Sequence, residues 1–315
     1  MPLAPEIAQL LASQATDSSF VRPGSGSMPI DEARLHHEAD AVRFTPVDAR
    51  DAIDNLTTAK LPEGPAGQHT RIYRPSGLER VPILIWFHGG GWVTGSLDTA
   101  DIAARALCAR AGMIVVTSEY PLAPEQPWPA AFEYAEALSR WVRGHSEQLG
   151  GNGVVLIGGD SAGGNIAACV AAQNHDLLDG QILIYPVIDL HLPSEAYRSR
   201  IDNGSGYYVG WDDVAWAIEQ YAPDTVRADP RVSPSQAAGL QGAPPAVIVV
   251  VEYDPLRDEG RAYADRLQRA GVHVVLLEFP GLVHGAFDML GLSPDANAAM
   301  WEVAQELHQL GTARH

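Results

Sequence analysis

Residues 154–164, Val-Val-Leu-Ile-Gly-Gly-Asp-Ser-Ala-Gly-Gly, decide the fold of this chain. The apolar run 154–157 has the length and β-branched composition of a buried strand, and the alanine-rich stretch 162–174 that follows predicts a helix. Between them Ser161 occupies a Gly-x-Ser-x-Gly pattern, in which a sharp strand-to-helix turn lifts the serine hydroxyl above the sheet. A phosphate-binding turn would need Gly-Lys-Ser/Thr or Gly-x-Gly-x-x-Gly, and neither occurs here. Ser161 is therefore a candidate nucleophile.

The same alternation of apolar strand and helix fills the centre of the chain on both sides of this stretch. It predicts an α/β fold whose mostly parallel sheet is buried on both faces. We expect strands at 83–87, 114–118, 154–157, 182–185, 247–252 and 274–279. Helices are expected at 99–111, 129–149, 162–174, 257–270 and 294–310.

Two segments stand outside this alternation. The first forty residues have helical spacing, interrupted at 23–29, and the short runs 42–47 and 69–75 that follow predict antiparallel edge strands. Residues 189–232 contain no convincing buried strand and are rich in tyrosine and tryptophan. This pattern predicts an insertion that packs over the sheet. If the insertion lies above the carboxyl edge of the sheet, its aromatic side chains would both pack and contact a ligand.

The strand expected at 83–87 runs directly into His88-Gly-Gly-Gly-Trp92. Backbone without side chains can turn its N–H groups toward a developing negative charge, and each such donor typically lowers a barrier by about 3–4 kcal/mol. The predicted oxyanion donors are the N–H groups of Gly90, Gly91 and Ala162, the residue after the candidate nucleophile. We interpret His88 as an organiser of this loop rather than a base.

A serine hydroxyl needs an imidazole to take its proton and a carboxylate to orient that imidazole. Asp254 and His284 follow the last two predicted strands, so all three groups would meet at the carboxyl edge of the sheet. Asp258 is the rival acid. Because Pro255 and the residues after it predict a helix already begun, Asp258 falls in a first helical turn, and Asp254 is preferred.

Taken together, these motifs resemble bacterial esterases of the hormone-sensitive-lipase-like group of α/β-hydrolases, in the branch with Gly-Asp-Ser-Ala-Gly at the nucleophile. The matching segments are 88–92, 120–125 with 129–131, 159–164, 254–260 and 284–285. The resemblance implies an α/β-hydrolase fold with a helical cap, and a carboxylesterase of short- to medium-chain esters that needs no cofactor or metal. Two departures occur: Pro121 stands where arginine is common, and Ala286 separates His284-Gly285 from Phe287.

The resemblance also implies a division of the chain and further site residues. The cap would comprise 1–45 and 189–232, and the catalytic domain 46–188 and 233–315. Support for the motifs and walls for the substrate pocket would come from separate sets of residues: His88, Gly89 and Asp160 for the first, and Trp92, Tyr207, Tyr208 and Trp211 for the second. A homodimer is expected on the same ground.

Two other functions stay open at this point. One is a hydrolase with the same machinery that acts on an amide, a lactone, a carbamate or an acetylated small molecule, which the triad alone does not exclude. The other is a ligand-binding receptor on the same fold that has lost catalysis. Receptors of that kind lack the catalytic histidine, and the presence of His284 argues against this reading.

Composition narrows the classes of partner. The 315 residues carry a net charge of −18 with a pI near 4.9, a surface that repels nucleic-acid phosphates and anionic lipid headgroups. No stretch has the form of a signal peptide or a membrane helix. Cys108 and Cys169 lie among apolar residues without metal-type spacing, which predicts buried free thiols. We therefore expect a cytoplasmic protein that binds neither nucleic acid nor membrane.

Overall fold

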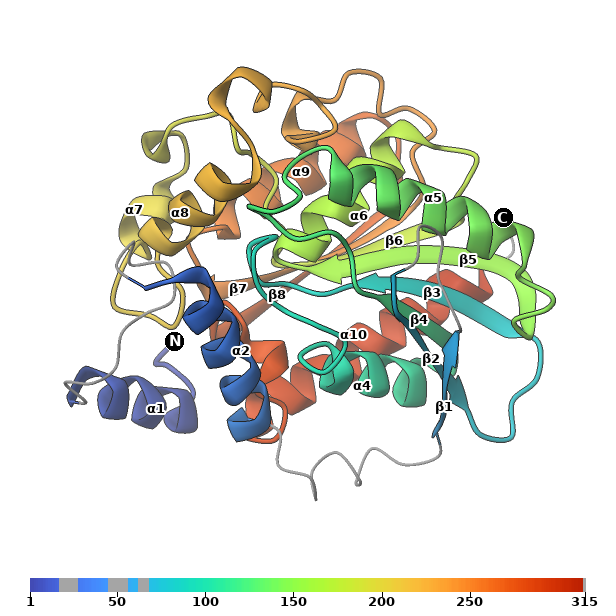
Figure 1. Ribbon diagram of the computed structural model, residues 1–315, viewed down its shortest axis with the longest axis horizontal. Coiled ribbons are helices and arrows are strands. Elements are labelled where there is room, and N and C mark those ends of the chain that lie inside the picture. The colour runs from blue at the N-terminus through green and yellow to red at the C-terminus, as the bar shows by residue number, and fades with distance from the viewer. Residues whose placement is uncertain (17–27, 45–55, 62–67, 314–315) are drawn as a thin grey trace.

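A computed structural model describes residues 1–16, 28–44, 56–61 and 68–313 (Figure 1). Its described residues form an eight-stranded sheet in the order β1-β2-β4-β3-β5-β6-β7-β8. The six strands from β4 to β8 in this order are parallel, and β2 and β1 extend the sheet antiparallel at one edge. The predicted mostly parallel α/β sheet is confirmed.

The strands are β1 Leu56–Leu61, β2 Thr70–Pro75, β3 Val81–Phe87, β4 Ile114–Ser118, β5 Gly151–Asp160, β6 Gly180–Ile184, β7 Ala246–Tyr253 and β8 Val274–Val283. The α-helices are α1 Pro5–Thr16, α2 Ile30–Phe44, α4 Asp101–Ala111, α5 Ala130–Gly144, α6 Ala162–Gln173, α7 Arg198–Asp202, α8 Trp211–Tyr221, α9 Arg257–Arg269 and α10 Pro294–Thr312.

All six strands and five helices predicted for the centre of the chain occur, with one correction among them and two nearer the N-terminus. The helix expected at 129–149 ends at Gly144, where a turn leads into β5. The prediction of a strand at 42–47 is wrong for 42–44, which form the last turn of α2. This turn is held because Phe44 is buried and packs edge-on with the Tyr208 ring. Residues 45–47 lie outside the described residues. Strand β1 was not expected from the sequence.

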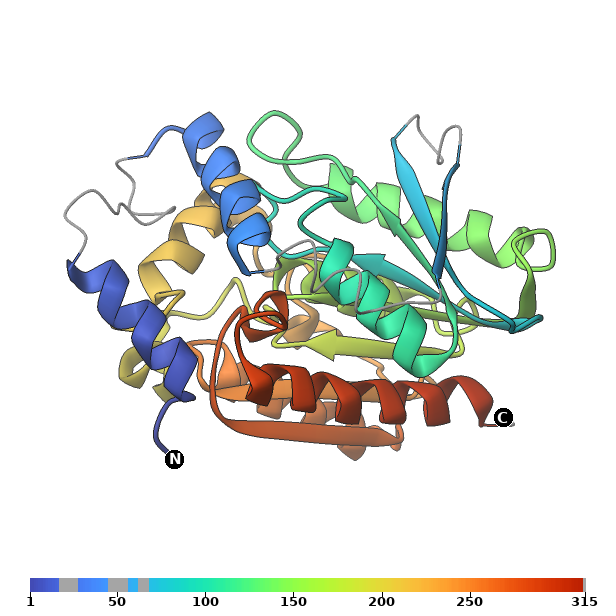
Figure 2. The same cartoon turned by 90° about the horizontal axis from the view of Figure 1, so that it is seen from below.

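The sheet is covered on both faces. Helices α4 and α10 pack on one face, and α5, α6 and α9 on the other (Figures 1 and 2). Six of the seven residues of β3 are buried, as are all five of β4. Burial on both faces explains why these strands are continuous apolar runs rather than alternating ones.

Two segments far apart in the sequence meet on one side of the molecule. Helix α2 and the pair α7 and α8 lie together on the left in Figure 1. Helix α2 is tied to the central domain by Arg34, which donates to the carbonyl oxygens of Val93 (2.9 Å) and Ala123 (3.2 Å) and pairs with Glu125. Residues 189–232 contain no strand, as expected from the sequence.

Candidate active site

Ser161 lies in the turn between β5 and α6. Its φ is +53°, a conformation unfavourable for a serine that persists only where the surroundings hold it. The Ser161 N–H donates to the carbonyl oxygen of Ile184 in the neighbouring strand at 2.9 Å. A side chain at Gly163 would overlap the carbonyl oxygen of Phe87, so glycine there lets α6 pack directly against the end of β3. The predicted turn is therefore present, with its serine at the carboxyl edge of the sheet.

Three predicted side chains meet at this turn. Ser161 Oγ lies 2.9 Å from His284 Nε2, and His284 Nδ1 lies 3.1 Å from Asp254 Oδ2. Neither Nδ1 nor Oδ2 has another hydrogen-bond partner among the described residues, so each is left for the other. Asp254 is fully buried and His284 is 4% exposed. A carboxylate on Nδ1 keeps the proton there and leaves Nε2 free to accept one from the serine.

The rival carboxylate has another role. Asp258 Oδ2 accepts the N–H of Ser199 at 2.9 Å, and its Oδ1 pairs with the guanidinium of Arg257 at 3.0 Å. It lies in the first turn of α9, as its sequence context predicted. Asp254 precedes that helix, and its Oδ1 accepts the Leu256 N–H at 2.8 Å. The structure thus brings Asp254, and not Asp258, to His284.

The loop of residues 88–92, which we call the oxyanion loop, follows β3 beside the serine. Gly90 has a φ of +109°, and a side chain there would overlap the carbonyl of Thr94. Within the described part of the chain, the N–H groups of Gly90 and Gly91 donate to no protein acceptor. Ala162 is buried at the start of α6, where a helix has unpaired N–H groups.

Buried side chains hold the oxyanion loop from behind. His88 stacks on Tyr120 with ring centroids 4.5 Å apart, and its Nδ1 lies 2.7 Å from the Gly89 carbonyl oxygen. A carbonyl only accepts, so Nδ1 carries the proton, and burial lowers the pKa of His88 to about 4. Asp160 Oδ1 accepts the Gly89 N–H at 3.0 Å, and burial raises the pKa of this carboxyl to about 7. His88 thus bonds within the oxyanion loop, whereas the imidazole at hydrogen-bond distance from Ser161 is that of His284.

Comparisons with known proteins agree with this geometry. A family model described as the alpha/beta hydrolase fold matches residues 84–288. The chain belongs to this α/β-hydrolase family. It is 40% identical over 266 residues to the carboxylic ester hydrolase LipN of Mycobacterium tuberculosis, covering 80% of this chain and 70% of LipN. It is 34% identical over 298 residues to an ethyl acetate hydrolase of Pseudomonas putida, covering 90% and 91% of the two chains.

Solved structures resemble this hydrolase over nearly its whole length. A hyperthermophilic esterase from Pyrobaculum calidifontis superposes with a TM-score of 0.87 at 31% identity, covering 99% of this chain and all of the other. A thermostable esterase from Pseudomonas putida has a TM-score of 0.89 at 27% identity, covering 99% of each chain. The α/β-hydrolase fold inferred from the sequence motifs is confirmed.

A cavity of about 180 Å³ opens beside Ser161 in this hydrolase. Its walls include the oxyanion loop, residues 98–103, α2 and the segment 208–217. The residues contributed by those last two elements are His37, Asp40, Ala41, Phe44, Tyr208, Val209, Asp213, Val214, Trp216 and Ala217. Carboxyl groups line it at Asp40, Asp98, Asp160, Asp213 and Asp288, and no lysine or arginine is among the described residues of the lining.

The predicted pocket residues divide into two pairs. Trp92 and Tyr208 line the cavity, with Trp92 stacked on Tyr221 at 4.5 Å and the Tyr208 hydroxyl donating to Asp40 Oδ2 at 2.8 Å. Tyr207 and Trp211 do not line it, so the prediction is wrong for them. The Tyr207 ring packs on Tyr253 with centroids 4.8 Å apart, and the half-buried Trp211 ring has its centroid 4.1 Å from the guanidinium carbon of Arg200.

Two further residues at the site were missed. Tyr185, at the end of β6, has a φ of +32°, and its ring centroid is 4.5 Å from that of His284. Asp288 lines the cavity, and burial together with the nearby Asp160 raises its pKa well above the usual range. The position of Asp288 four residues after His284 was a usable signal. Nothing in the sequence marks Tyr185, because only the fold brings its ring to the imidazole.

Three further features bear on partners. Over residues 1–16, 28–44, 56–61 and 68–313, no group of three or more His, Cys, Asp or Glu side chains could hold a metal ion. No helix in that part of the chain combines the length and apolar character needed to cross a bilayer. Cys108 and Cys169 are buried free thiols, as predicted.

Proposed function

We propose that Ser161, His284 and Asp254 hydrolyse carboxylic esters through an acyl-enzyme formed on the serine. The protein is a carboxylesterase, in line with the named activities of its relatives. The observation that carries the catalytic assignment is the continuous chain of contacts, 2.9 Å from Ser161 to His284 and 3.1 Å from His284 to Asp254.

In the first half-reaction Ser161 Oγ attacks the ester carbonyl carbon while His284 Nε2 takes the hydroxyl proton. The carbonyl oxygen becomes an oxyanion that accepts from the N–H groups of Gly90, Gly91 and Ala162. His284 then gives its proton to the departing alcohol, which leaves the acyl group on Ser161. A water molecule attacks this ester with His284 as base, and the acid is released as Ser161 regains its proton. Asp254 stabilises the imidazolium in both halves.

The shape of the cavity favours small, uncharged esters. Its volume of about 180 Å³ lies below the roughly 300–1,000 Å³ of sites for drug-sized ligands, which supports short to medium acyl chains. The described residues of the lining include carboxyl groups and no lysine or arginine, which supports neutral esters over anionic ones. We further propose that residues 1–45 and 189–232 form a cap that encloses this cavity, over a catalytic domain of 46–188 and 233–315. Cytoplasmic location and a homodimer stay predictions from the sequence.

The experiment is covalent labelling with an alkyl fluorophosphonate, combined with turnover of p-nitrophenyl esters from butyrate to palmitate. We expect stoichiometric labelling at Ser161 and faster turnover of butyrate to octanoate than of palmitate. Ser161→Ala should abolish labelling and lower kcat on the order of 10⁶-fold. Turnover that survives this substitution would remove the acyl-enzyme mechanism. An amide and a lactone of matched size test the neighbouring hydrolase activities.

A further inference from the structure

Helix α7 and the residue after it lie against the loop that carries Asp254. We call residues 254–258 the acid loop. Asn203 Nδ2 donates to the carbonyl oxygen of Asp254 at 3.1 Å and to that of Glu252 at 3.0 Å. Asn203 is 6% exposed, and both bonds span about fifty positions of sequence. One side chain from the insertion thus holds the backbone on both sides of Tyr253, immediately before the triad carboxylate.

Ser199 makes a second set of contacts with the same loop. Its hydroxyl donates to the carbonyl oxygen of Pro255 at 2.8 Å and accepts the N–H of Asp258 at 3.1 Å. Its own N–H donates to the carboxylate of Asp258 at 2.9 Å. Ser199 is fully buried. Between them, Ser199 and Asn203 bind the loop before, at and after the residue that orients His284.

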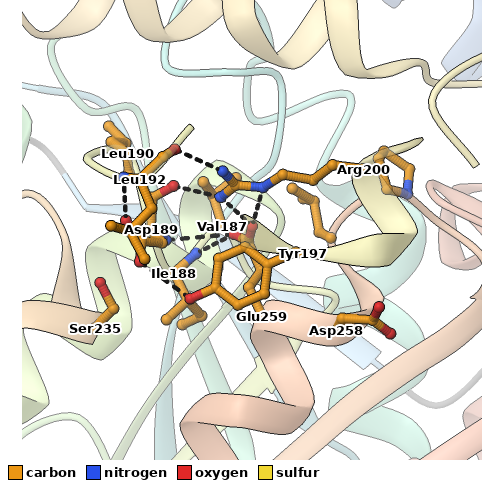
Figure 3. Close-up of polar contacts among 12 residues, drawn as sticks. Val187, Ile188, Asp189, Leu190, Leu192, Tyr197, Arg200, Ser235, Asp258 and Glu259 are labelled. Atoms are coloured by element: carbon orange, nitrogen blue, oxygen red, sulfur yellow. Dashed lines mark hydrogen bonds and ion pairs between the residues drawn. The ribbon is translucent and has the colours of Figure 1, made fainter. Parts of the chain in front are cut away.

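A buried ion pair anchors α7 in this position (Figure 3). Arg200 Nε donates to Glu259 Oε2 at 2.9 Å, both side chains are fully buried, and Glu259 lies in the first turn of α9. The other Glu259 oxygen accepts the N–H of Ile188 at 2.7 Å. Burial raises the pKa of Glu259 to about 7 against the opposing pull of the guanidinium. The pair therefore ties the insertion to α9 and to Ile188, the residue just before the insertion.

The remaining donors of Arg200 are also used. They reach the carbonyl oxygens of Asp189 at 2.6 Å and Leu192 at 2.9 Å, and the guanidinium lies over the Trp211 and Tyr197 rings at 4.1 and 4.7 Å. A planar guanidinium held on every side fixes the helix that bears it. This contact places Trp211, expected in the pocket from its sequence, half-buried against Arg200 and outside the cavity lining.

We propose that Asn203 and Ser199 are positioning residues for Asp254, and that the Arg200–Glu259 pair holds them in place. The inference rests on the proposed role of Asp254 as the triad acid. The insertion would then do more than enclose the cavity, because it sets the place of the carboxylate. A displacement of about 1 Å in a catalytic group can cost on the order of 100-fold in rate, so loss of these bonds should be visible in turnover.

The test compares Asn203→Ala with Asn203→Asp. Alanine removes the donor, and aspartate keeps the shape but turns an acceptor toward two carbonyl oxygens. We expect kcat to fall about 10- to 100-fold in the alanine variant and further in the aspartate variant, with KM changed by less than about twofold. Ser199→Ala, which removes only the hydroxyl, is the second variant and should lower kcat less than Asn203→Ala.

The pH profile separates positioning from general destabilisation. The titratable groups around His284 include Asp254, Asp288, Asp160 and Tyr185. A carboxylate that has moved away stabilises the imidazolium less. The acidic limb of the kcat/KM profile should therefore shift to lower pH in Asn203→Ala and in Ser199→Ala. Partial unfolding would only reduce the number of active sites. Titration of active sites with the fluorophosphonate corrects for that loss.

Arg198→Ala is the matched control. Arg198 is on the same helix, is 77% exposed and pairs with Asp202 at the surface, so its loss should leave kcat and the pH profile unchanged. An unlabelled, inactive wild-type protein would overturn the proposed function. An active wild type whose Asn203 and Ser199 variants keep its kcat and its acidic limb would overturn the positioning role alone. If Asn203→Ala does not fold, Ser199→Ala decides the question.

Discussion

The oxyanion loop and the acid loop serve the same serine but are held in different ways. The oxyanion loop is shaped by backbone at Gly90 and Gly163, which have no room for a side chain, and is held by Asp160 at the end of β5. The acid loop is held by side chains, Asn203 and Ser199, that come from the insertion. The difference teaches that the core of the fold fixes the electrophilic half of the site, whereas the acid depends on a segment outside the strand–helix alternation.

The strongest test of this contrast is Gly90→Ala. The added carbon would overlap the Thr94 carbonyl at a φ of +109°, so the loop must move and its N–H donors turn away. We expect kcat to fall about 10²- to 10³-fold, as for the loss of an oxyanion donor, measured on p-nitrophenyl butyrate. Gly144→Ala, at the end of α5 with open space around it, is the control. Full activity in the Gly90 variant would mean that backbone shape does not set this loop.

Asp160→Asn tests how much the buried Asp160 carboxylate behind the oxyanion loop lowers the free energy of unfolding. The folded pKa of about 7 exceeds the unfolded value of about 3.9, so the native state binds the extra proton and wild-type stability falls as pH rises between them. Asparagine can still accept the Gly89 N–H. As the pH rises from 5 to 6.5, the free energy of unfolding of the variant should rise by about 2 kcal/mol relative to that of the wild type. Urea denaturation at each pH measures it. A constant difference over this range would contradict the prediction.

Arg34→Met asks whether the oxyanion loop also depends on a helix outside the sheet domain. Methionine keeps the apolar stem but loses the donors to Val93 and Ala123, so α2 should loosen where it lines the cavity. We expect kcat/KM to fall about threefold to tenfold, mainly through KM; this corresponds to about 1 kcal/mol, because the lost bonds hold a wall of the cavity and do not contact the substrate. Arg269→Met, in an exposed pair on α9, should have no effect. A loss in kcat as large as that of the Asn203 variants would erase the contrast between the two loops.

The sequence predicts well which of Ser161, Asp254 and His284 come together, because the signals around them are local. A strand, a glycine-rich turn and a helix surround Ser161. Pro255 marks the start of a helix, so that Asp254 precedes this helix and Asp258 lies within it. The supporting groups depend instead on packing between distant segments. Tyr185 is strained against His284, and Asn203 reaches a carbonyl some fifty positions later. The prediction that Tyr207 and Trp211 line the pocket is wrong for the same reason, since an aromatic side chain in an insertion can line the cavity or pack on other side chains outside it.

Among the strands that the structure describes, β8 is the outermost of the sheet on its side and pairs with β7. His284 follows it directly, whereas Ser161 and the oxyanion loop are built by strands in the middle. A refolding chain whose last strand has not yet docked would hold a nucleophile without a base. Recovery of esterase turnover during refolding therefore reports when β8 docks on β7. Comparing its rate with that of the return of helical circular dichroism would show whether β8 docks last.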